Sequence, residues 1–206
     1  MNLMQARDMA GRLTYWAEPM NCAAFTLPTS YCHTGVALSK NPKAICSQCY
    51  AKIGSRYIEA SAAAAQQKRI DAITNLPAGQ WIDALVYMLQ HQPFQRMFWH
   101  DSGDLQGEEH FERICEVARR TPDIQHRIST KEWQYVNTTS IPENMILRYS
   151  ALAINHRGPD EFGLTCGVYE KSRVHEAKAD AVCYDDMRPH WDKSKQFVVD
   201  ILRWER

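Results

Sequence analysis

The chain has 206 residues, of which 45% are hydrophobic and 23% charged, and its formal net charge is zero. This size and composition suit one domain with an ordinary core, and they exclude a disordered chain. A chain with no net charge has no general attraction to nucleic acid, so nucleic acid could bind only through a local basic groove. We find neither the apolar core of a signal peptide nor about 18 consecutive apolar residues, so we expect a cytoplasmic protein of the host cell without a membrane segment.

The N-terminal quarter is organised around cysteines. Residues 1–20 are predicted to form a short helix or strand before a turn at Glu18-Pro19, and residues 34–45 lack a regular helical pattern. Cys46 and Cys49 form a C-x-x-C, a spacing that lets two thiolates reach one metal or cluster.

Cys32 lies upstream of that pair, next to His33, and Cys22 lies further back. The convergence of several cysteines favours a metal or iron–sulfur site over a buried cysteine pair or a redox dithiol. An odd total of seven cysteines also argues against a complete disulfide framework.

The middle of the chain alternates helices and strands. Helices are predicted at residues 51–75, 80–90, 107–120 and 132–137, and strands at 95–100, 124–129 and 145–152. Strands and helices that alternate through short loops indicate a parallel sheet with helices on it, which is an α/β fold.

Polar residues follow three of these strands, at the edge where ligands gather in parallel sheets. They are His100, Asp101, Ser102 and Asp104 after the first strand, Thr130 and Lys131 after the second, and Ser150 at the third. The two aspartates could bind a cation or act as acid and base, although Asp104 could instead cap the next helix. Lys131 could bind an anionic group or pair with an aspartate, and His100 could face the core or the pocket.

The last quarter has little periodicity from residue 156 to 186. Cys166, His175, Cys183 and His190 could form a zinc site, although their spacings fit no compact finger and better suit two buried cysteines and two surface histidines. Residues 197–204 are predicted to form a helix rather than an edge strand, because Phe197, Ile201 and Trp204 would share a face.

A nucleic-acid surface has weak support. Three arginines, together with the Lys and Arg residues of the C-terminal tail, could form a basic patch, and three aromatic side chains could stack on bases. The three arginines and three aromatic residues are Arg119, Arg120, Arg127, Trp99, Trp133 and Tyr135. Charged helix faces and core aromatic residues explain the same side chains equally well.

Several motifs resemble the phage gene-product-88-like proteins. They are Leu27-Pro28 before Cys32, the segment from Cys46 to Ala51 with Gly54 and Tyr57, His100 to Gln106, Thr130 to Glu132, and Trp191 to Lys193. The resemblance covers roughly residues 20–193, in order. It implies an incomplete barrel of the radical-enzyme kind, similar to a TIM barrel, with cysteines placed for iron–sulfur ligation.

The chain departs from that family pattern near its C-terminus. The family has a cysteine and then a Cys-x-x-Cys-x-x-Cys, whereas the matching positions hold Cys166, Cys183, Met187 and His190. The four-cysteine site is therefore lost, and a mixed site or none remains. Cys32, Cys46 and Cys49 are then the expected ligands of a 4Fe-4S cluster, with zinc as the alternative. Their spacing is not the C-x-x-x-C-x-x-C of enzymes that use S-adenosylmethionine, so that cofactor is not inferred.

Two functions follow for one domain, which we divide into a metal-binding segment (1–57), an α/β core (58–155) and an irregular C-terminal segment (156–206). The first is an iron–sulfur enzyme whose Asp101, Asp104 and Lys131 act on a small anionic or nucleotide-like substrate. The second is a non-enzymatic module, stabilised by a metal, that binds a host or phage protein or a nucleic acid.

Overall fold

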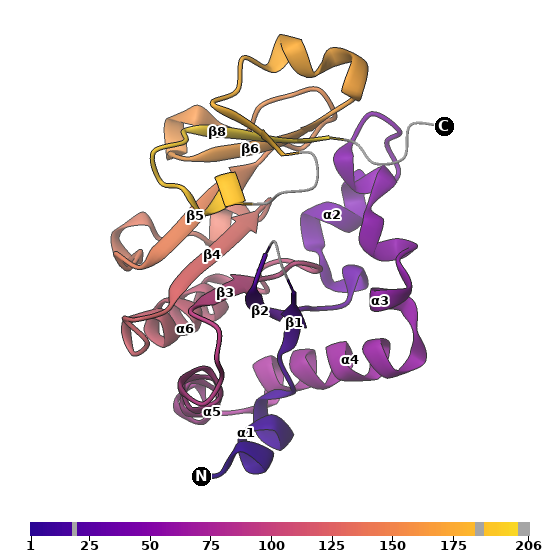
Figure 1. The fold of residues 1–206 in the computed structure, drawn as a ribbon. Helices are drawn as coiled ribbons and strands as arrows, with labels where there is room; N and C mark the ends of the chain where they lie inside the picture. The colour runs from indigo at the N-terminus through magenta and orange to yellow at the C-terminus, as the bar shows by residue number, and fades with distance from the viewer. Residues whose placement is uncertain (18–19, 184–187, 202–206) are drawn as a thin grey trace.

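The computed structural model describes residues 1–17, 20–183 and 188–201. Within this part, eight strands form one sheet in the order β1-β2-β3-β4-β5-β6-β8-β7 (Figure 1). β1 is antiparallel to β2, and all other neighbouring strands are parallel. The strands are β1 (Thr14–Trp16), β2 (Cys22–Phe25), β3 (Arg96–Trp99), β4 (Gln125–Thr130), β5 (Met145–Ser150), β6 (Thr165–Tyr169), β7 (Ala181–Cys183) and β8 (Phe197–Ile201).

The helices begin and end where local chemistry requires. They are α1 (Leu3–Ala10), α2 (His33–Leu38), α3 (Ser55–Ile58), α4 (Ala60–Asn75), α5 (Ala78–Gln90) and α6 (Glu108–Arg119). Asn2 and Gln5 form a capping box at the start of α1. Pro77 lies between α4 and α5 and is the N-cap of α5. Glu108 lies in the first turn of α6, where the helix dipole favours a negative charge.

Short 3-10 helices complete the connections. They are η1 (Thr29–Tyr31), η2 (Ile45–Gln48), η3 (Tyr50–Lys52), η4 (Trp133–Tyr135), η5 (Thr138–Ser140), η6 (Asp160–Phe162), η7 (Lys171–Ala177) and η8 (Arg188–Trp191). Three of them flank α2 and α3, so the cysteine segment is built from short helical turns and not from one open loop.

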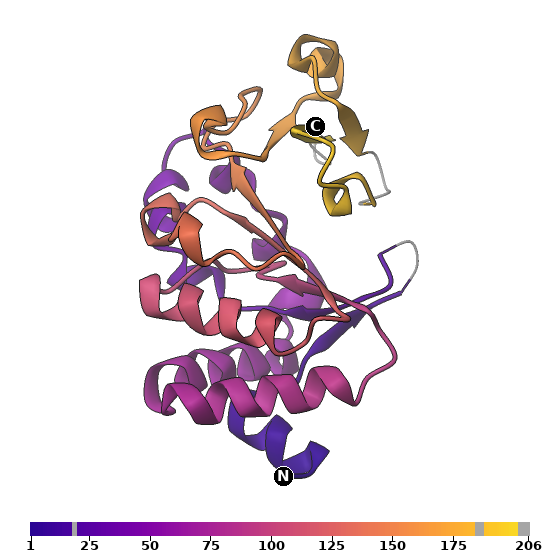
Figure 2. The same cartoon turned by 90° about the vertical axis from the view of Figure 1, so that its left-hand side faces the viewer.

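Alternate strand residues face opposite sides of the sheet. One side, with Phe25, Trp99 and Ile128, joins the main core together with residues of α1, α4, α5 and α6. Viewed from the side, α4, α5 and α6 lie stacked together, and the C-terminal strands lie at the end opposite α1 (Figure 2). On the other side, which we call the inner face, Ala24 and Phe98 pack with Trp191.

The structure confirms the mixed α/β fold with a mostly parallel sheet. The comparison with an incomplete TIM barrel is not confirmed, because the sheet is open, with β1 and β7 at its edges. The predicted strands and helices of residues 80–150 are present within a few residues, except that 132–137 holds only the 3-10 turn η4.

Two expectations outside that region are wrong. The helix predicted at 51–75 begins only at Ala60, because Gly54 and Glu59 adopt extended backbone angles before α3 and α4. Residues 34–45, expected to be irregular, include most of α2. The turn expected at Glu18-Pro19 lies outside the described residues.

The C-terminal quarter differs most from expectation. Residues 156–183, the described part of the segment expected to be irregular, contribute η6, β6, η7 and β7 instead. The helix predicted from Phe197 is instead β8, which pairs in parallel with both β6 and β7. Its buried residues Val198 and Val199 face opposite sides of the sheet, which is why the segment has no alternation of polar and apolar residues. Residues 202–204 of the predicted helix lie outside the described part.

In the described part of the chain, no helix combines the length and the apolar character needed to cross a membrane.

Candidate functional site

Backbone and side-chain hydrogen bonds join the ends of β2 and β3. The Ser102 hydroxyl donates to the Leu27 carbonyl at 2.8 Å, and the Leu27 amide donates back to the Ser102 carbonyl at 2.8 Å. Gly103 adopts φ +85° beside Leu27, and a Cβ at Gly103 would lie 2.4 Å from the Leu27 Cβ. A glycine is therefore required for this close approach.

Asp104 links the ends of β3 and β4. Its Oδ1 accepts from the Leu105 amide at 2.8 Å and from the Thr130 hydroxyl at 2.5 Å, and its Oδ2 accepts from the Lys131 amide at 3.0 Å. Asp104 does not cap α6, whose N-cap is Gly107. Burial raises the pKa of Asp104, while these hydrogen bonds oppose the rise. Both carboxylate oxygens have partners, so Asp104 holds the two strand ends together.

Asp101 differs from Asp104, although both come from the same DSGD segment. Its Oδ2 accepts from Trp16 Nε1 at 2.5 Å and from the Tyr57 hydroxyl at 3.5 Å, whereas its buried Oδ1 has no partner among the described residues. Its backbone carbonyl accepts from the Tyr50 hydroxyl. Burial raises the pKa of Asp101, and the hydrogen bond from Trp16 limits the rise. Of the two aspartates in this segment, Asp101 is therefore the one with an acceptor oxygen that has no partner among the described residues.

Glu132 fastens the cysteine segment to the end of β4. This fully buried carboxylate accepts from the Thr34 amide at 2.6 Å and from the Thr34 hydroxyl at 2.9 Å. Thr34 lies in the first turn of α2, directly after Cys32 and His33. The hydrogen bonds thus fix the position of the Cys32 turn relative to the strand ends.

Cys32 and Cys46 approach each other over Gly35 of α2. A Cβ on Gly35 would lie 2.8 Å from the Cys32 Cβ, 3.5 Å from the Cys46 Sγ and 3.7 Å from the Cys32 Sγ. The absence of a side chain at Gly35 therefore leaves room for two sulfurs on one side of the helix. Burial raises the pKa of Cys32 to about 12 and also raises the pKa of Cys46. Cys49 follows η2, and all three thiols are half-buried and free of disulfides.

Lys131 follows β4 and interacts electrostatically with these thiols. Burial lowers the pKa of Lys131, but electrostatic interactions, first with Cys46 and then with Asp104, raise it above its usual value. Cys166 on β6 and Cys49 contribute to the same rise. The Lys131 ammonium group is thus within electrostatic range of both the cysteine segment and the inner face.

The other predicted substrate-binding residues occupy different places. Thr130 donates to Asp104 and accepts from the Glu132 amide at 2.9 Å, so its hydroxyl is used within the strand-end network. Ser150 lies at the end of β5, with its Oγ 3.4 Å from the Cys166 Sγ.

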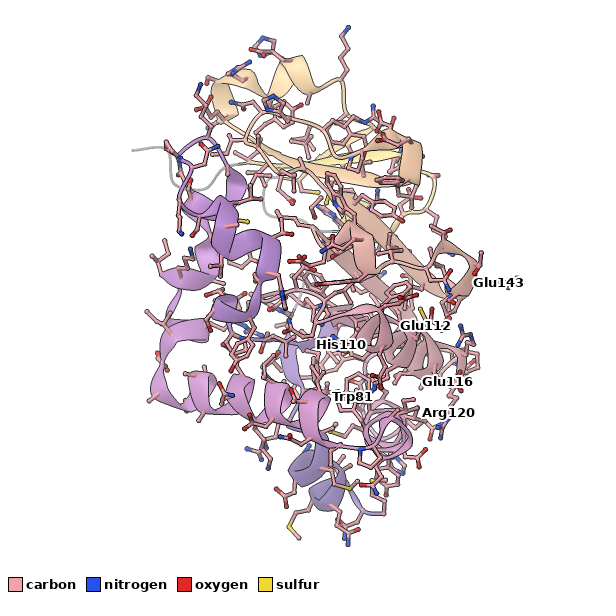
Figure 3. All side chains as sticks on the ribbon, turned by 180° about the vertical axis from the view of Figure 1, so that it is seen from behind. Trp81, His110, Glu112, Glu116, Arg120 and Glu143 are labelled. Atoms are coloured by element: carbon pink, nitrogen blue, oxygen red, sulfur yellow. The ribbon has the colours of Figure 1, made fainter. Side chains whose placement is uncertain are left out.

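His100 points toward the helices, where its ring centroid lies 5.2 Å from that of His110. His110 in turn lies beside Trp81, with ring centroids 5.6 Å apart between α6 and α5 (Figure 3). Burial lowers the pKa of His100 to about 3, which keeps the imidazole neutral.

The predicted C-terminal set is only partly brought together. Cys183 on β7 and His190 on η8 converge with Asp200 on β8, so that one ligand atom from each lies within 4.8 Å of the others. His175 is exposed on η7, and Cys166 contacts Ser150 on β6. Neither belongs to that group. Asp200 was not predicted as a possible ligand, because its segment was expected to form a helix and it belongs to the strand β8.

Four of the six side chains named for a nucleic-acid surface have other contacts in the structure. Arg127 and Trp99 are buried on opposite faces of the sheet. Arg120 pairs with Asp83 at 2.8 Å, and Arg119 pairs with Glu116 at 3.0 Å, so these arginines belong to an ordinary charged helix surface. Figure 3 shows Glu116 and Arg120 on that outward side of α6.

Comparison with known proteins identifies one family. The model of the family described as Gene product 88 matches residues 3–197, which include the cysteine segment, the DSGD segment and all strands up to the start of β8. No curated protein and no solved structure matches the chain. The resemblance seen in residues 20–193 is therefore confirmed at the level of the family.

Proposed function

Because this chain belongs to the Gene product 88 family, and its cysteine segment adjoins polar strand ends, we propose that it is a phage-type iron–sulfur enzyme. Cys32, Cys46 and Cys49 would hold a 4Fe-4S cluster, and the strand ends would bind a small anionic or nucleotide-like substrate. The observation that carries the proposal is the convergence of Cys32 and Cys46 over Gly35, next to Lys131.

The spacing of the three sulfurs fits a cluster better than a single zinc ion. In the described part of the chain, they do not all lie within 4.8 Å of one another. Four ligands around one zinc at about 2.3 Å would bring sulfurs to about 3.8 Å of each other. A cluster spreads its ligands over several irons, so it accepts wider spacing.

Each part of the chain then has a defined task. A cluster with three cysteine ligands leaves one iron open, which supplies electron transfer or Lewis-acid chemistry. Lys131 binds the anionic group of the substrate, because its ammonium group is positive and half-buried. Asp101 accepts or returns a proton through its unpaired Oδ1, and its raised pKa brings it closer to neutral pH.

Metal analysis of protein purified without oxygen tests the cluster. We expect iron and sulfide in the protein and broad visible absorption, and we expect both to be lost in Cys46→Ala. Cys115→Ala is the matched control, because Cys115 is buried in α6 within the main core. Protein that carries no iron, or Cys46→Ala protein that keeps its iron, would contradict the proposal.

Asp101→Asn tests the catalytic assignment. The amide oxygen can still accept from Trp16, so we expect iron content and melting temperature to stay nearly unchanged. Turnover, found by screening phosphorylated nucleosides by mass spectrometry, should fall by roughly 10²- to 10⁴-fold because a proton acceptor is lost. Asp104→Asn is the contrast and should lower stability, because an amide nitrogen cannot accept. Loss of both iron and fold in Asp101→Asn would make Asp101 structural.

A metal-stabilised binding module is the second candidate. The cysteine segment exposes apolar side chains, namely Tyr31, Val36, Ile53 and Ile58. A protein partner could cover them. Colourless protein that carries zinc at Cys32, Cys46 and Cys49 would favour this module over the enzyme.

A further inference from the structure

Three side chains of metal-binding type meet at the C-terminal end of the sheet. Cys183, His190 and Asp200 each place one ligand atom within 4.8 Å of the other two. Cys183 and His190 are buried and Asp200 is half-buried. His190 Nε2 lies 2.9 Å from Asp200 Oδ1, a contact that holds the imidazole beside the carboxylate and leaves Nδ1 for another partner.

The imidazole of His190 gives a second, independent indication. His190 is fully buried, and its Nδ1 has no hydrogen-bond partner among the described residues. Buried polar nitrogens are normally hydrogen-bonded, and one that is not calls for an explanation such as a missing ion. Metal ligation by a ring nitrogen is one of the main uses of neutral histidine.

A buried arginine lies beside the same group. The guanidinium of Arg127 is within 5.9 Å of the ring centroid of Trp191, the residue that follows His190, and 4.3 Å from that of Phe98. Its one hydrogen bond in the described part of the chain goes to Ser129 at 3.4 Å, and its Nε and Nη1 have no partner. Burial lowers the pKa of Arg127, and Asp200 is the first of the groups that oppose this, so the guanidinium lies near one of the proposed ligands.

We propose that Cys183, His190 and Asp200 bind a zinc ion whose fourth position, beside Arg127, takes an anionic oxygen ligand. Sulfur, imidazole and carboxylate are the donors that zinc accepts, and three protein ligands with one open position are typical of catalytic zinc. A thiolate and a carboxylate neutralise the charge of Zn²⁺. The positive charge of Arg127 then remains, and an anion such as a phosphate or carboxylate group balances it.

Zinc content, measured by elemental mass spectrometry on protein from zinc-supplemented cells, tests the metal. We expect one zinc per chain, retained in Cys46→Ala and lost in Cys183→Ser and in His190→Ala. His175→Ala is the matched control, because this exposed histidine lies outside the group. Zinc that stays bound in both Cys183→Ser and His190→Ala, or that leaves with His175→Ala, would refute the site.

Cobalt substitution covers the case in which those two variants fail to fold. Cys46→Ala protein stripped of metal and given one equivalent of Co²⁺ should show the thiolate-to-metal absorption of a tetrahedral site. No such absorption would refute the site even in folded protein. This background removes the proposed cluster, so the outcome is independent of the iron–sulfur proposal.

Inorganic phosphate probes the open position in the same cobalt protein. Phosphate should shift the visible bands, and Arg127→Gln should weaken the shift at least about tenfold without loss of cobalt, because the guanidinium supplies the charge-assisted hydrogen bonds. A phosphate response equal in Arg127→Gln, or no response in either protein, would overturn the assignment of Arg127.

Discussion

His126 has only one protonation state that satisfies its neighbours. Trp99 Nε1 donates to His126 Nδ1 at 3.0 Å, so Nδ1 must be unprotonated. The Thr121 hydroxyl donates to the Val117 carbonyl at 2.7 Å, and its oxygen, 2.8 Å from His126 Nε2, accepts the remaining ring hydrogen. A second ring proton would point at the indole N–H, so this chain of bonds keeps the imidazole neutral.

Acid should therefore destabilise the protein through His126. Burial lowers its pKa to about 3, whereas an exposed histidine titrates near 6.5. The unfolded chain binds the extra proton first, so stability falls as the pH drops from about 6.5 toward 3. At pH 5 the loss is about 2 kcal/mol for this residue. Urea unfolding at pH 7 and pH 5 should show a smaller difference for His126→Gln than for the wild type.

Comparison with the variant is needed because His100 is also held neutral, with its pKa lowered to about 3 by burial. Subtracting the curve of His126→Gln removes that shared contribution. Equal pH dependence in the two proteins would mean that the native fold admits a protonated His126.

At the same scale, sequence identifies residue types but not their partners. Asp101 and Asp104 are equivalent members of one DSGD segment in the sequence. Only the structure shows that Asp104 has partners on both oxygens, while one oxygen of Asp101 has none within the described residues. The partner of Asp101, Trp16, lies 85 residues away in the chain, a contact that no local pattern encodes.

At the scale of elements, the hydrogen bonds of Glu132 connect β4 with α2. Glu132→Ala should release α2 and the Cys32 turn, because both Thr34 bonds to a buried carboxylate are lost. Bonds to charged groups contribute about 1.5–3 kcal/mol each, so we expect a destabilisation of about 3 kcal/mol together with a large loss of iron. Denaturant unfolding and iron analysis measure the two effects.

Gln134→Ala is the control for Glu132→Ala. Gln134 also donates to Glu132, at 2.9 Å, but it is not part of the Thr34 link. Its loss should leave iron content unchanged. Full iron content in Glu132→Ala would show that the cysteine turn holds its position without β4.

Helices that bury only one face could be predicted from the sequence. α5 and α6 have apolar residues at helical spacing, and both appear within two residues of the expected ends. β8 has both faces covered, and its run FVVDI fits a helix and a buried strand equally well. Pairing with β6 and β7 decides between them, and such long-range pairing is not visible in a local pattern.

For the whole molecule, Arg148 joins the central sheet to the C-terminal segment. This fully buried guanidinium on β5 donates to backbone carbonyls of five residues, which are Thr165, Pro189, His190, Asp192 and Lys195. Four of them lie in the segment that crosses the inner face before β8. The position of His190, and with it the proposed zinc site, therefore depends on a residue of the central sheet.

Arg148→Met should affect the two proposed metal sites differently, with loss of zinc and retention of iron. Methionine fills much of the space but provides no donors, so buried carbonyls lose their partners; removing one side of such a network costs about 3–5 kcal/mol. We expect that loss in denaturant unfolding, together with loss of zinc, while iron stays bound because the Glu132 and Asp104 links are intact. Arg119→Met, which removes an exposed arginine, should change stability by less than about 0.5 kcal/mol. If Arg148→Met kept its zinc and its stability, the segment before β8 would be held by Trp191 and the inner-face aromatic residues instead.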